Sequence, residues 1–227
     1  MIEFNNVSVK YDSGDVALDN VNLRINDGEF VFIVGHSGAG KTTLTKVLLG
    51  EKKITSGILK VNGSSLRNMK PKDLPMLRRS IGVVFQDFRL IERKNVFENV
   101  ALPLRIIGQS PASIQKKVKS LLSLVGLENK KDSFPKQLSG GEQQRVAFVR
   151  AIASNPQIII ADEPTGNVDR ELAWQLFELL EKINEKGKTV IVVTHDMEIV
   201  NRYKHRTVTI ENGKITYDTF FSQGAEV

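Results

Sequence analysis

Apolar and polar positions form two kinds of pattern along the chain, one typical of strands and one typical of helices. Short runs of β-branched and aromatic residues, bounded by glycine or polar turns, predict buried strands at 29–34, 81–85, 158–161 and 189–193. Apolar residues at helical spacing, each series ended by a glycine, predict helices at 42–49 and 171–186. Strands that alternate with helices in this way predict an α/β fold.

Shorter apolar segments near both ends predict further strands. Asn62-Gly63 and Asn212-Gly213 are strong hairpin signals, and Asn5-Asn6 and the polar turn 12–15 break the N-terminal pattern. The predicted strands are 2–4, 7–11, 21–25, 58–61, 207–210 and 214–217. We therefore expect an N-terminal antiparallel β subdomain beside the α/β core.

Between residues 87 and 155 the strand patterns disappear and helix signals dominate. Ser110-Pro111 is an N-cap and N1 pair, and it precedes one apolar face made of Ile114, Val118, Leu121, Leu122 and Val125. Ser139 followed by Glu142 is a capping box, which opens a helix to about Asn155. We expect one domain, with a helical lobe at about 87–155 inserted in a core of about 1–86 and 156–217, and a short tail at 218–227.

Composition and charge narrow the class of protein. Of the 227 residues, 41% are hydrophobic and 26% are charged, which is ordinary for a globular chain, and the absence of cysteine excludes disulfides and cysteine-based sites. No apolar run approaches the roughly 18 residues of a membrane helix, and Met1-Ile2-Glu3-Phe4 has no basic leader, so we do not expect export. The net charge of +6 is dispersed in short groups. A solvated surface is the first interpretation of this charge, attraction to an anionic membrane surface is the second, and nucleic-acid binding is a distant third, so we expect no nucleic-acid partner.

Residues 35–42 carry the phosphate-binding pattern G-x-x-x-x-G-K-[ST], placed between a predicted strand and a predicted helix. Glycines allow backbone N–H groups to surround phosphate oxygens at a helix N-terminus. Lys41 is expected to reach the β and γ phosphates, and the Thr42 hydroxyl to bind Mg²⁺. A glycine-rich turn without a ligand is the alternative, but both flanks favour a nucleotide site. The binding stretch is Gly35, His36, Ser37, Gly38, Ala39, Gly40, Lys41, Thr42 and Thr43.

Polar residues follow three of the predicted buried strands, at the edge where open α/β sheets bind ligands. Gln86 could reach a metal-bound water, or it could only cap its strand. Asp162 could bind Mg²⁺, and Glu163 could act as the general base that orients the attacking water. Alternatively, the two carboxylates could only cap the next helix. His195 is a candidate for contact with the γ-phosphate. Tyr11, at the end of a predicted strand, could stack on a base, although packing at the edge of the core is the simpler role.

The order of these elements resembles the ATP-binding cassette (ABC) ATPases, from about Ile2 to Tyr217. The most specific part is Leu-Ser-Gly-Gly-Glu-Gln-Gln-Arg at 138–145, which marks this family among P-loop proteins. The resemblance implies that Tyr11 stacks on adenine, that Gln86 is the Q-loop glutamine and contributes to the metal site, and that His195 is the switch histidine. It also implies that 166–169, which ends at Asp169, is the D-loop. Its middle, Asn167-Val168, departs from the usual Ala-Leu.

The resemblance also implies a homodimer that forms upon ATP binding. In this family the signature residues contact ATP held by the other subunit, in a head-to-tail pair with two shared sites. The residues carried over to this role are Ser139, Gly140, Gly141 and Glu142.

Within the family, residues 77–90 and 162–169 are similar to a cell-division subfamily whose ATPase works with an integral membrane protein. Lipoprotein-release and macrolide-export ATPases share much of the pattern. We therefore expect a cytoplasmic subunit, peripheral at the inner face of the membrane, with the coupling helix of its partner in a groove near 86–98. Two functions are therefore possible, control of cell-wall hydrolysis during cell division or transport across the membrane. A soluble ABC protein acting on ribosomes or DNA ranks last, because the chain has no second cassette and no coiled-coil insertion.

Overall fold

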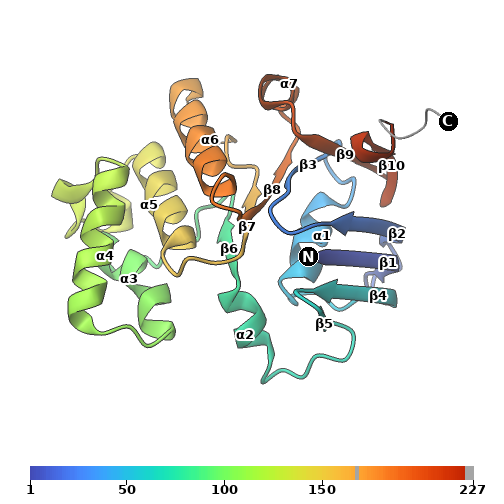
Figure 1. The fold of residues 1–227 in the computed structure, drawn as a ribbon, viewed down its shortest axis with the longest axis horizontal. Coiled ribbons are helices and arrows are strands. Elements are labelled where there is room, and N and C mark those ends of the chain that lie inside the picture. The colour runs from blue at the N-terminus through green and yellow to red at the C-terminus, as the bar shows by residue number, and fades with distance from the viewer. Residues whose placement is uncertain (167–168, 223–227) are drawn as a thin grey trace. The chain divides into compact units, whose positions relative to one another are not determined.

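A computed structural model describes residues 1–166 and 169–222 of the chain (Figure 1). The residues divide into two compact units. The first contains Met1–Arg78 and Asn184–Val227, and the second contains Arg79–Ile183.

One sheet of the first unit is antiparallel and has the strand order β2-β1-β4-β5. Its strands are β1 (Ile2–Lys10), β2 (Val16–Ile25), β4 (Ser56–Val61) and β5 (Ser64–Ser65). One face of the sheet is apolar: Ile2 and Phe4 of β1 are buried, as are Val7 and Val9, with every second residue buried on each side of an irregularity at residues 5 and 6. The sheet matches the predicted antiparallel subdomain.

The prediction of separate strands at 2–4 and 7–11 is wrong, because β1 is continuous. Asn6 has a φ of +50°, and the register against β2 shifts between Phe4 and Val7. An irregularity of this kind admits an extra polar residue without ending the strand. Asn5 and Asn6 therefore interrupt the strand pattern in the sequence, whereas in the structure they form a bulge within one strand.

The phosphate-loop pattern lies in the other part of the first unit, where the strand order is β10-β9-β3-β8. The strands are β3 (Phe30–Val34), β8 (Thr189–Thr194), β9 (Arg206–Glu211) and β10 (Lys214–Asp218). β3 is parallel to both β8 and β9, and every residue of β3 and β8 is buried. The helices of this unit are α1 (Lys41–Leu48), α2 (Leu74–Arg79, ending at the boundary), α7 (Met197–Tyr203) and α8 (Thr219–Ser222).

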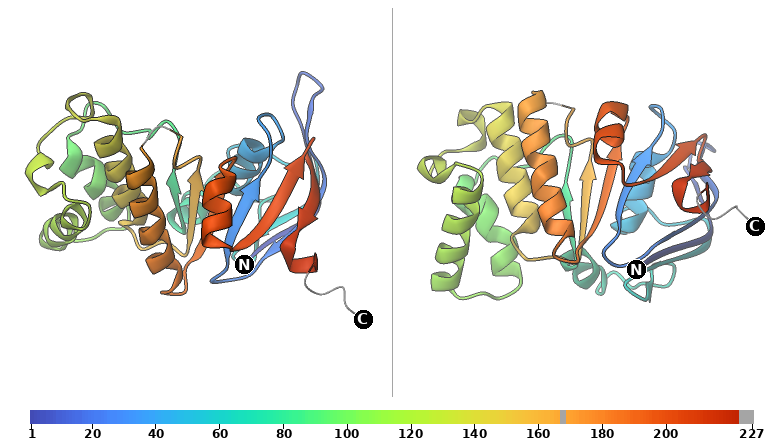
Figure 2. Two further views of the ribbon diagram at one scale, coloured as in Figure 1. Left: turned by 90° about the horizontal axis from the view of Figure 1, so that it is seen from above. Right: turned by 45° about the horizontal axis from the view of Figure 1, so that its top comes forward.

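The second unit packs helices against the parallel pair β6 (Ile81–Val84) and β7 (Ile158–Asp162). Helix α5 packs on β6 so closely that a Cβ at Gly82 would lie 2.3 Å from the Ala151 carbonyl oxygen. Figure 2 shows α3, α4 and α5 grouped together in two further views. The helices are α3 (Val96–Ile106), α4 (Pro111–Leu124), α5 (Gly140–Ile152) and α6 (Arg170–Asn184), with 3-10 turns at Glu128–Lys130 and Pro135–Gln137.

The predicted helices of this unit are confirmed where their start signals are local. Ser110 caps α4, and Ser139 with Glu142 forms the capping box of α5. Helix α3 has no counterpart among the predicted helices, because Pro103 lies inside it and disrupts the sequence pattern. The predicted lobe of 87–155 falls within this unit, and its limits stay a prediction.

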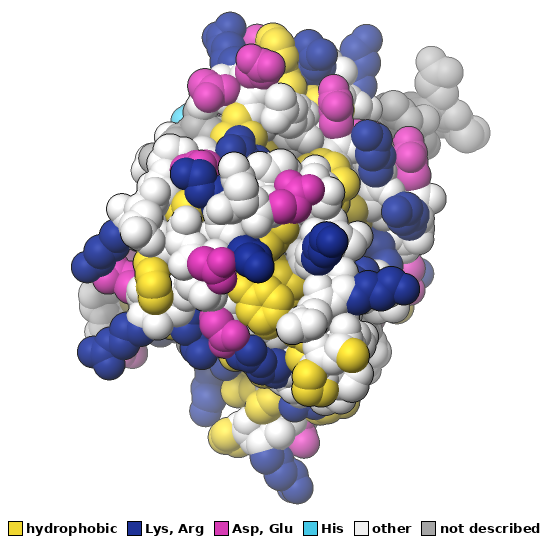
Figure 3. All heavy atoms as spheres, turned by 90° about the vertical axis from the view of Figure 1, so that its left-hand side faces the viewer, with side chains coloured by type: hydrophobic (Ala, Val, Ile, Leu, Met, Phe, Trp, Pro, Cys, Tyr) yellow, Lys and Arg dark blue, Asp and Glu magenta, His cyan; other side chains and the backbone are white. Residues whose placement is uncertain are grey.

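Basic and acidic side chains are interspersed on the face drawn in Figure 3, with small apolar areas between them. Among the residues that the structure describes, no helix has the length and hydropathy needed to span a membrane.

Candidate functional site

The phosphate loop in the first unit forms a bend of exposed backbone between β3 and α1. Residues 36–38 are exposed, whereas Lys41 is only 7% exposed. Its ammonium group donates hydrogen bonds to the carbonyl oxygens of Gly35 (2.6 Å) and His36 (3.1 Å). Because no side chain caps α1, its first N–H groups can serve an anionic ligand. The loop thus places one cation and a helix N-terminus together.

Two glycines of the loop are required by its packing. A Cβ at Gly35 would lie 2.2 Å from the Ile210 carbonyl oxygen, and one at Gly40 would lie 2.4 Å from that of Ala17. Gly40 also has a φ of +110°, which favours glycine strongly. These contacts fix the path of the loop against β9 and β2.

His195 directly follows β8, whose end lies beside the start of the phosphate loop. Val34 pairs with Thr194 in the parallel ladder, so Gly35 and His195 are the next residues on neighbouring strands. His195 is exposed, and Asp196 after it caps α7 by accepting from the N–H groups of Glu198 and Ile199. The structure therefore brings together the predicted phosphate loop and the predicted histidine.

Tyr11 is tied to the same region through its hydroxyl group. The hydroxyl lies 3.1 Å from Thr43 Oγ1, two residues beyond Lys41, and the Lys52 ammonium lies 4.4 Å from the ring centroid. Tyr11 is half-buried, so part of the ring is open. The structure thus fixes Tyr11 next to α1, in a position that suits either predicted role.

The parallel pair of the second unit places three predicted residues at one edge. Val84 pairs with Ala161, so the carboxyl ends of β6 and β7 lie side by side. Asp162 is the last residue of β7, Glu163 follows it, and Gln86 comes two residues after the end of β6. A Cβ built on Gly166 would lie 3.4 Å from Gln86 Nε2, which puts the glutamine side chain along the turn after β7. Glu163 has a φ of +48°, a conformation that is rare for residues with a side chain and is often found at functional sites.

The signature residues form the first turn of α5. Ser139 Oγ accepts from the Glu142 N–H (3.2 Å), and the Ser139 N–H donates to a Glu142 carboxylate oxygen (2.8 Å). That backbone donor is the main reason why the pKa of Glu142 is lowered from its ordinary value. Ser139 and Gly140 are exposed, and a Cβ on Gly141 would lie 2.8 Å from Leu172 of α6. The helix N-terminus is thus open, with α6 close behind it.

Asp169 caps α6. Its carboxylate accepts from the Leu172 N–H at 2.9 Å, and its carbonyl oxygen accepts from the Ala173 N–H at 3.0 Å. The other D-loop positions, Asn167 and Val168, lie outside the described residues. Within the described part of the chain, these hydrogen bonds of Asp169 are those of a helix cap.

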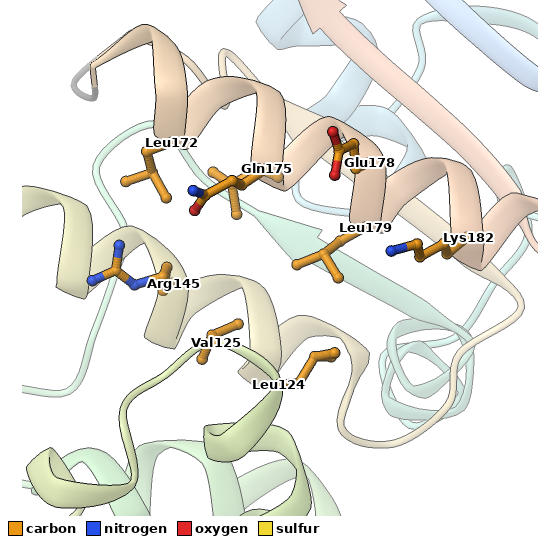
Figure 4. A pocket seen from close by; sticks show the side chains of 9 residues that line it. Leu124, Val125, Arg145, Leu172, Gln175, Glu178, Leu179 and Lys182 are labelled. Carbon is orange, nitrogen blue, oxygen red and sulfur yellow. The ribbon is translucent and has the colours of Figure 1, made fainter.

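Farther along the same two helices, α5 and α6 border a pocket of about 240 Å³ (Figure 4). One wall is apolar, with Leu172, Leu176 and Leu179, and the charged lining side chains are Arg145, Glu178 and Lys182. None of the predicted site residues lines this pocket, although its lining residue Leu172 lies beside Gly141.

Gln144 and Arg150 are two polar contacts of α5 that the sequence analysis missed. Gln144 is 1% exposed, and its Nε2 donates to the Pro164 carbonyl oxygen at 2.8 Å, in the turn that follows Glu163. Arg150 donates to two carbonyl oxygens beyond Gln86. Gln144 falls inside the signature pattern, which was a signal, whereas Arg150 has no local signal.

The donor set fits a magnesium ion that is held mainly by phosphate. Mg²⁺ in nucleotide sites keeps several waters and takes one or two protein oxygens. In the first unit Thr42 is exposed and has a hydroxyl oxygen of this kind, and in the second unit Asp162, which is 9% exposed, has a carboxylate. Within residues 1–166 and 169–222 no cluster of three His, Cys, Asp or Glu side chains could hold an ion unaided.

Comparison with known proteins identifies the family of this chain. A family model described as ABC transporter matches residues 18–166. The cell division ATP-binding proteins FtsE of Streptococcus pneumoniae serotype 2 (strain D39) and Bacillus subtilis (strain 168) are each 49% identical over 218 residues. Each alignment covers 96% of this chain, and 95% and 96% of the two relatives.

A solved structure shares the fold over nearly the whole length. It is the dimeric, post-hydrolysis state of the ATP-binding cassette MJ0796 bound to ADP and Pi, with a TM-score of 0.90 and 39% identity. The match covers 96% of this chain and 97% of that chain. These findings confirm the predicted α/β fold with its antiparallel β part. The chain therefore belongs to the ABC transporter family, and it is an ATP-binding, ATP-hydrolysing cassette.

Proposed function

We propose that this ATPase is the cytoplasmic subunit of a membrane complex that acts in cell division, with an FtsX-like integral membrane protein as its partner. One observation carries the proposal. Proteins named cell division ATP-binding protein FtsE are 49% identical to the chain over 96% of its length in Streptococcus pneumoniae and Bacillus subtilis, and 42% identical over 95% in Escherichia coli (strain K12).

The residues proposed to bind ATP belong mainly to the first unit, and Gln86 and Asp162 of the second unit are added as proposed contacts of Mg²⁺. The N–H groups of the phosphate loop and the Lys41 ammonium bind the β and γ phosphates, and Tyr11 stacks on the adenine. Mg²⁺, when bound, neutralises charge that develops on the phosphates, with Thr42, Asp162 and Gln86 as its protein contacts. His195 contacts the γ-phosphate from the tip of β8.

The second unit supplies the proposed base. The Glu163 carboxylate accepts a proton from water while the water oxygen forms a bond to the γ-phosphorus. The bond between that phosphorus and the bridging oxygen of ADP breaks, which yields ADP and phosphate. The unusual φ of Glu163 supports this role, because strained residues gather at reactive sites.

Two copies are proposed to share ATP in a homodimer. The exposed start of α5, with Ser139, Gly140, Gly141 and Glu142, contacts the γ-phosphate held by the other copy, and Asp169 lies at the same interface. MJ0796 is dimeric with ADP and Pi bound, which supports this arrangement. Hydrolysis removes a ligand that bridges the copies, so the dimer opens.

The partner is proposed to dock near residues 86–98, and its movement controls cell-wall hydrolases. The alternative is an ATPase subunit of a lipoprotein-release or macrolide-export complex. Ile91 in this stretch is 36% exposed, whereas Ile107, just after α3, is 38% exposed and lies outside it. The two isoleucines provide a test position and a matched control.

The test is to isolate the tagged chain from membranes after crosslinking and to identify its partners. We expect an FtsX-like protein with the wild type and with Ile107→Asp, and its loss with Ile91→Asp, because a buried charge opposes docking. Recovery of only a lipoprotein-release or export permease would contradict the cell-division role. Equal recovery with Ile91→Asp would contradict the proposed docking stretch.

A further inference from the structure

Two residues just beyond Gln86 adopt a backbone conformation that their side chains disfavour. Phe88 has a φ of +58° and Arg89 has a φ of +46°. Single glycine or asparagine residues adopt this region easily, whereas consecutive residues of other types do so rarely. The surrounding structure must therefore hold this turn in place.

Arg150 of α5 supplies the contacts that hold the turn. Its Nη1 donates to the Arg89 carbonyl oxygen at 2.6 Å, and its Nη2 donates to the Phe88 carbonyl oxygen at 2.7 Å. The guanidinium fork thus binds the carbonyls of both strained residues. Within the turn, Arg89 also lies over the Phe85 ring and donates to Asp87.

Burial of Arg150 lowers the pKa of its guanidinium to about 10, so it stays charged at neutral pH. Its hydrogen-bond partners among the described residues are the two carbonyl oxygens, and no carboxylate of that set pairs with it. A partly buried charge without a carboxylate is costly, so simple packing would favour an apolar residue here. What Arg150 provides and an apolar residue could not is its pair of hydrogen bonds to the turn.

The turn has a direct connection to the proposed reaction. Gln86 lies two residues before Phe88, and its side chain lies along Gly166, in the turn that follows Glu163. The same helix α5 also holds that second turn, through Gln144 and the Pro164 carbonyl oxygen. Both loops are therefore attached to the helix that begins at Ser139.

We propose that Arg150 is a positioning residue for Gln86, because it fixes the strained Phe88-Arg89 turn that sets the direction of the glutamine side chain. The inference rests on the proposed role of Gln86 in hydrolysis. Arg150 itself is proposed to make no contact with ATP, so it affects turnover only through Gln86.

The test is a double-mutant cycle of Arg150→Met and Gln86→Ala, with Arg150→Lys as the conservative variant. We expect Arg150→Met to lower kcat by about 10- to 100-fold, as misplacement of a catalytic group does. KM for ATP should stay within about twofold, because the phosphate loop is unchanged. Arg150→Lys should retain part of kcat. In the Gln86→Ala background, Arg150→Met should add nothing.

Two readouts separate this role from general destabilisation. Hydrogen exchange without nucleotide should accelerate at the amides of residues 88 and 89 in Arg150→Met. Adding Arg89→Gly to Arg150→Met should restore part of kcat, because glycine adopts a positive φ unaided.

Losses that add fully in the double variant, or unchanged kcat in a folded Arg150→Met, would overturn the inference. If Gln86→Ala alone leaves kcat and the Mg²⁺ requirement unchanged, the proposed role of Gln86 fails instead.

Discussion

At the scale of single residues, Tyr11 is held in a defined place before any base reaches it. Its N–H donates to the Asp15 carbonyl oxygen at 2.9 Å, and its hydroxyl lies 3.1 Å from Thr43 Oγ1. A ring that is already fixed loses little entropy when a base stacks on it. This attachment is compatible with both predicted roles of Tyr11, so a measurement has to separate stacking on a base from packing at the edge of the core.

Tyr11→Ala should weaken ATP binding by about 5- to 150-fold, which corresponds to about 1–3 kcal/mol for base–aromatic stacking. Tyr11→Phe keeps the ring and should change the dissociation constant by no more than about threefold. Calorimetric titration of the two variants measures both. If the two variants bind equally well and differ only in thermal stability, Tyr11 is a packing residue.

At the scale of elements, the first turn of α5 combines a structural and a functional role in one side chain. Ser139 caps the helix, and its exposed end is proposed to face a phosphate. The two roles can be separated, because aspartate is about as good an N-cap as serine but repels a phosphate.

Ser139→Asp should leave the free energy of unfolding within about 0.5 kcal/mol, whereas Ser139→Ala should lower it by about 1 kcal/mol. Both should reduce ATPase activity, Ser139→Asp by about 10²-fold or more. Denaturant unfolding and steady-state turnover measure the two effects. Normal turnover in folded Ser139→Asp would remove the signature turn from the proposed phosphate contacts.

The elements that sequence predicted well are those with local signals. The capping box of Ser139 and Glu142, the Ser110-Pro111 start of α4 and the phosphate loop each lie within a few residues, so short-range chemistry determines them. The same local patterns predicted the ends of β6, β7 and β8, beside Gln86, Glu163 and His195, to within one residue.

The features that sequence could not predict depend on contacts far along the chain. Arg150 bonds to residues 61 and 62 positions away, and nothing near Arg150 signals a partner. The left-handed turn at Phe88 and Arg89 contains neither glycine nor asparagine, so turn chemistry gave no sign of it. The bulge at Asn6 looks like a strand break in the sequence, because the pairing of β1 with β2 and β4 on either side is not visible there.

At the scale of the whole molecule, the proposed roles are distributed over both units. Tyr11, the phosphate loop and His195 belong to the first, whereas Glu163 and the signature turn belong to the second. We propose that ATP, contacted by such residues, is shared by two copies of the chain. A variant that binds ATP without hydrolysing it can show whether the two copies come together.

Glu163→Gln should slow hydrolysis by about 10²–10⁴-fold, because it removes the proposed base. The decisive measurement is its mass by light scattering, with and without Mg-ATP. We predict one chain without nucleotide and two with it, and one chain in both conditions when Ser139→Asp is added. A single-chain mass in Glu163→Gln with ATP demonstrably bound would contradict the shared site.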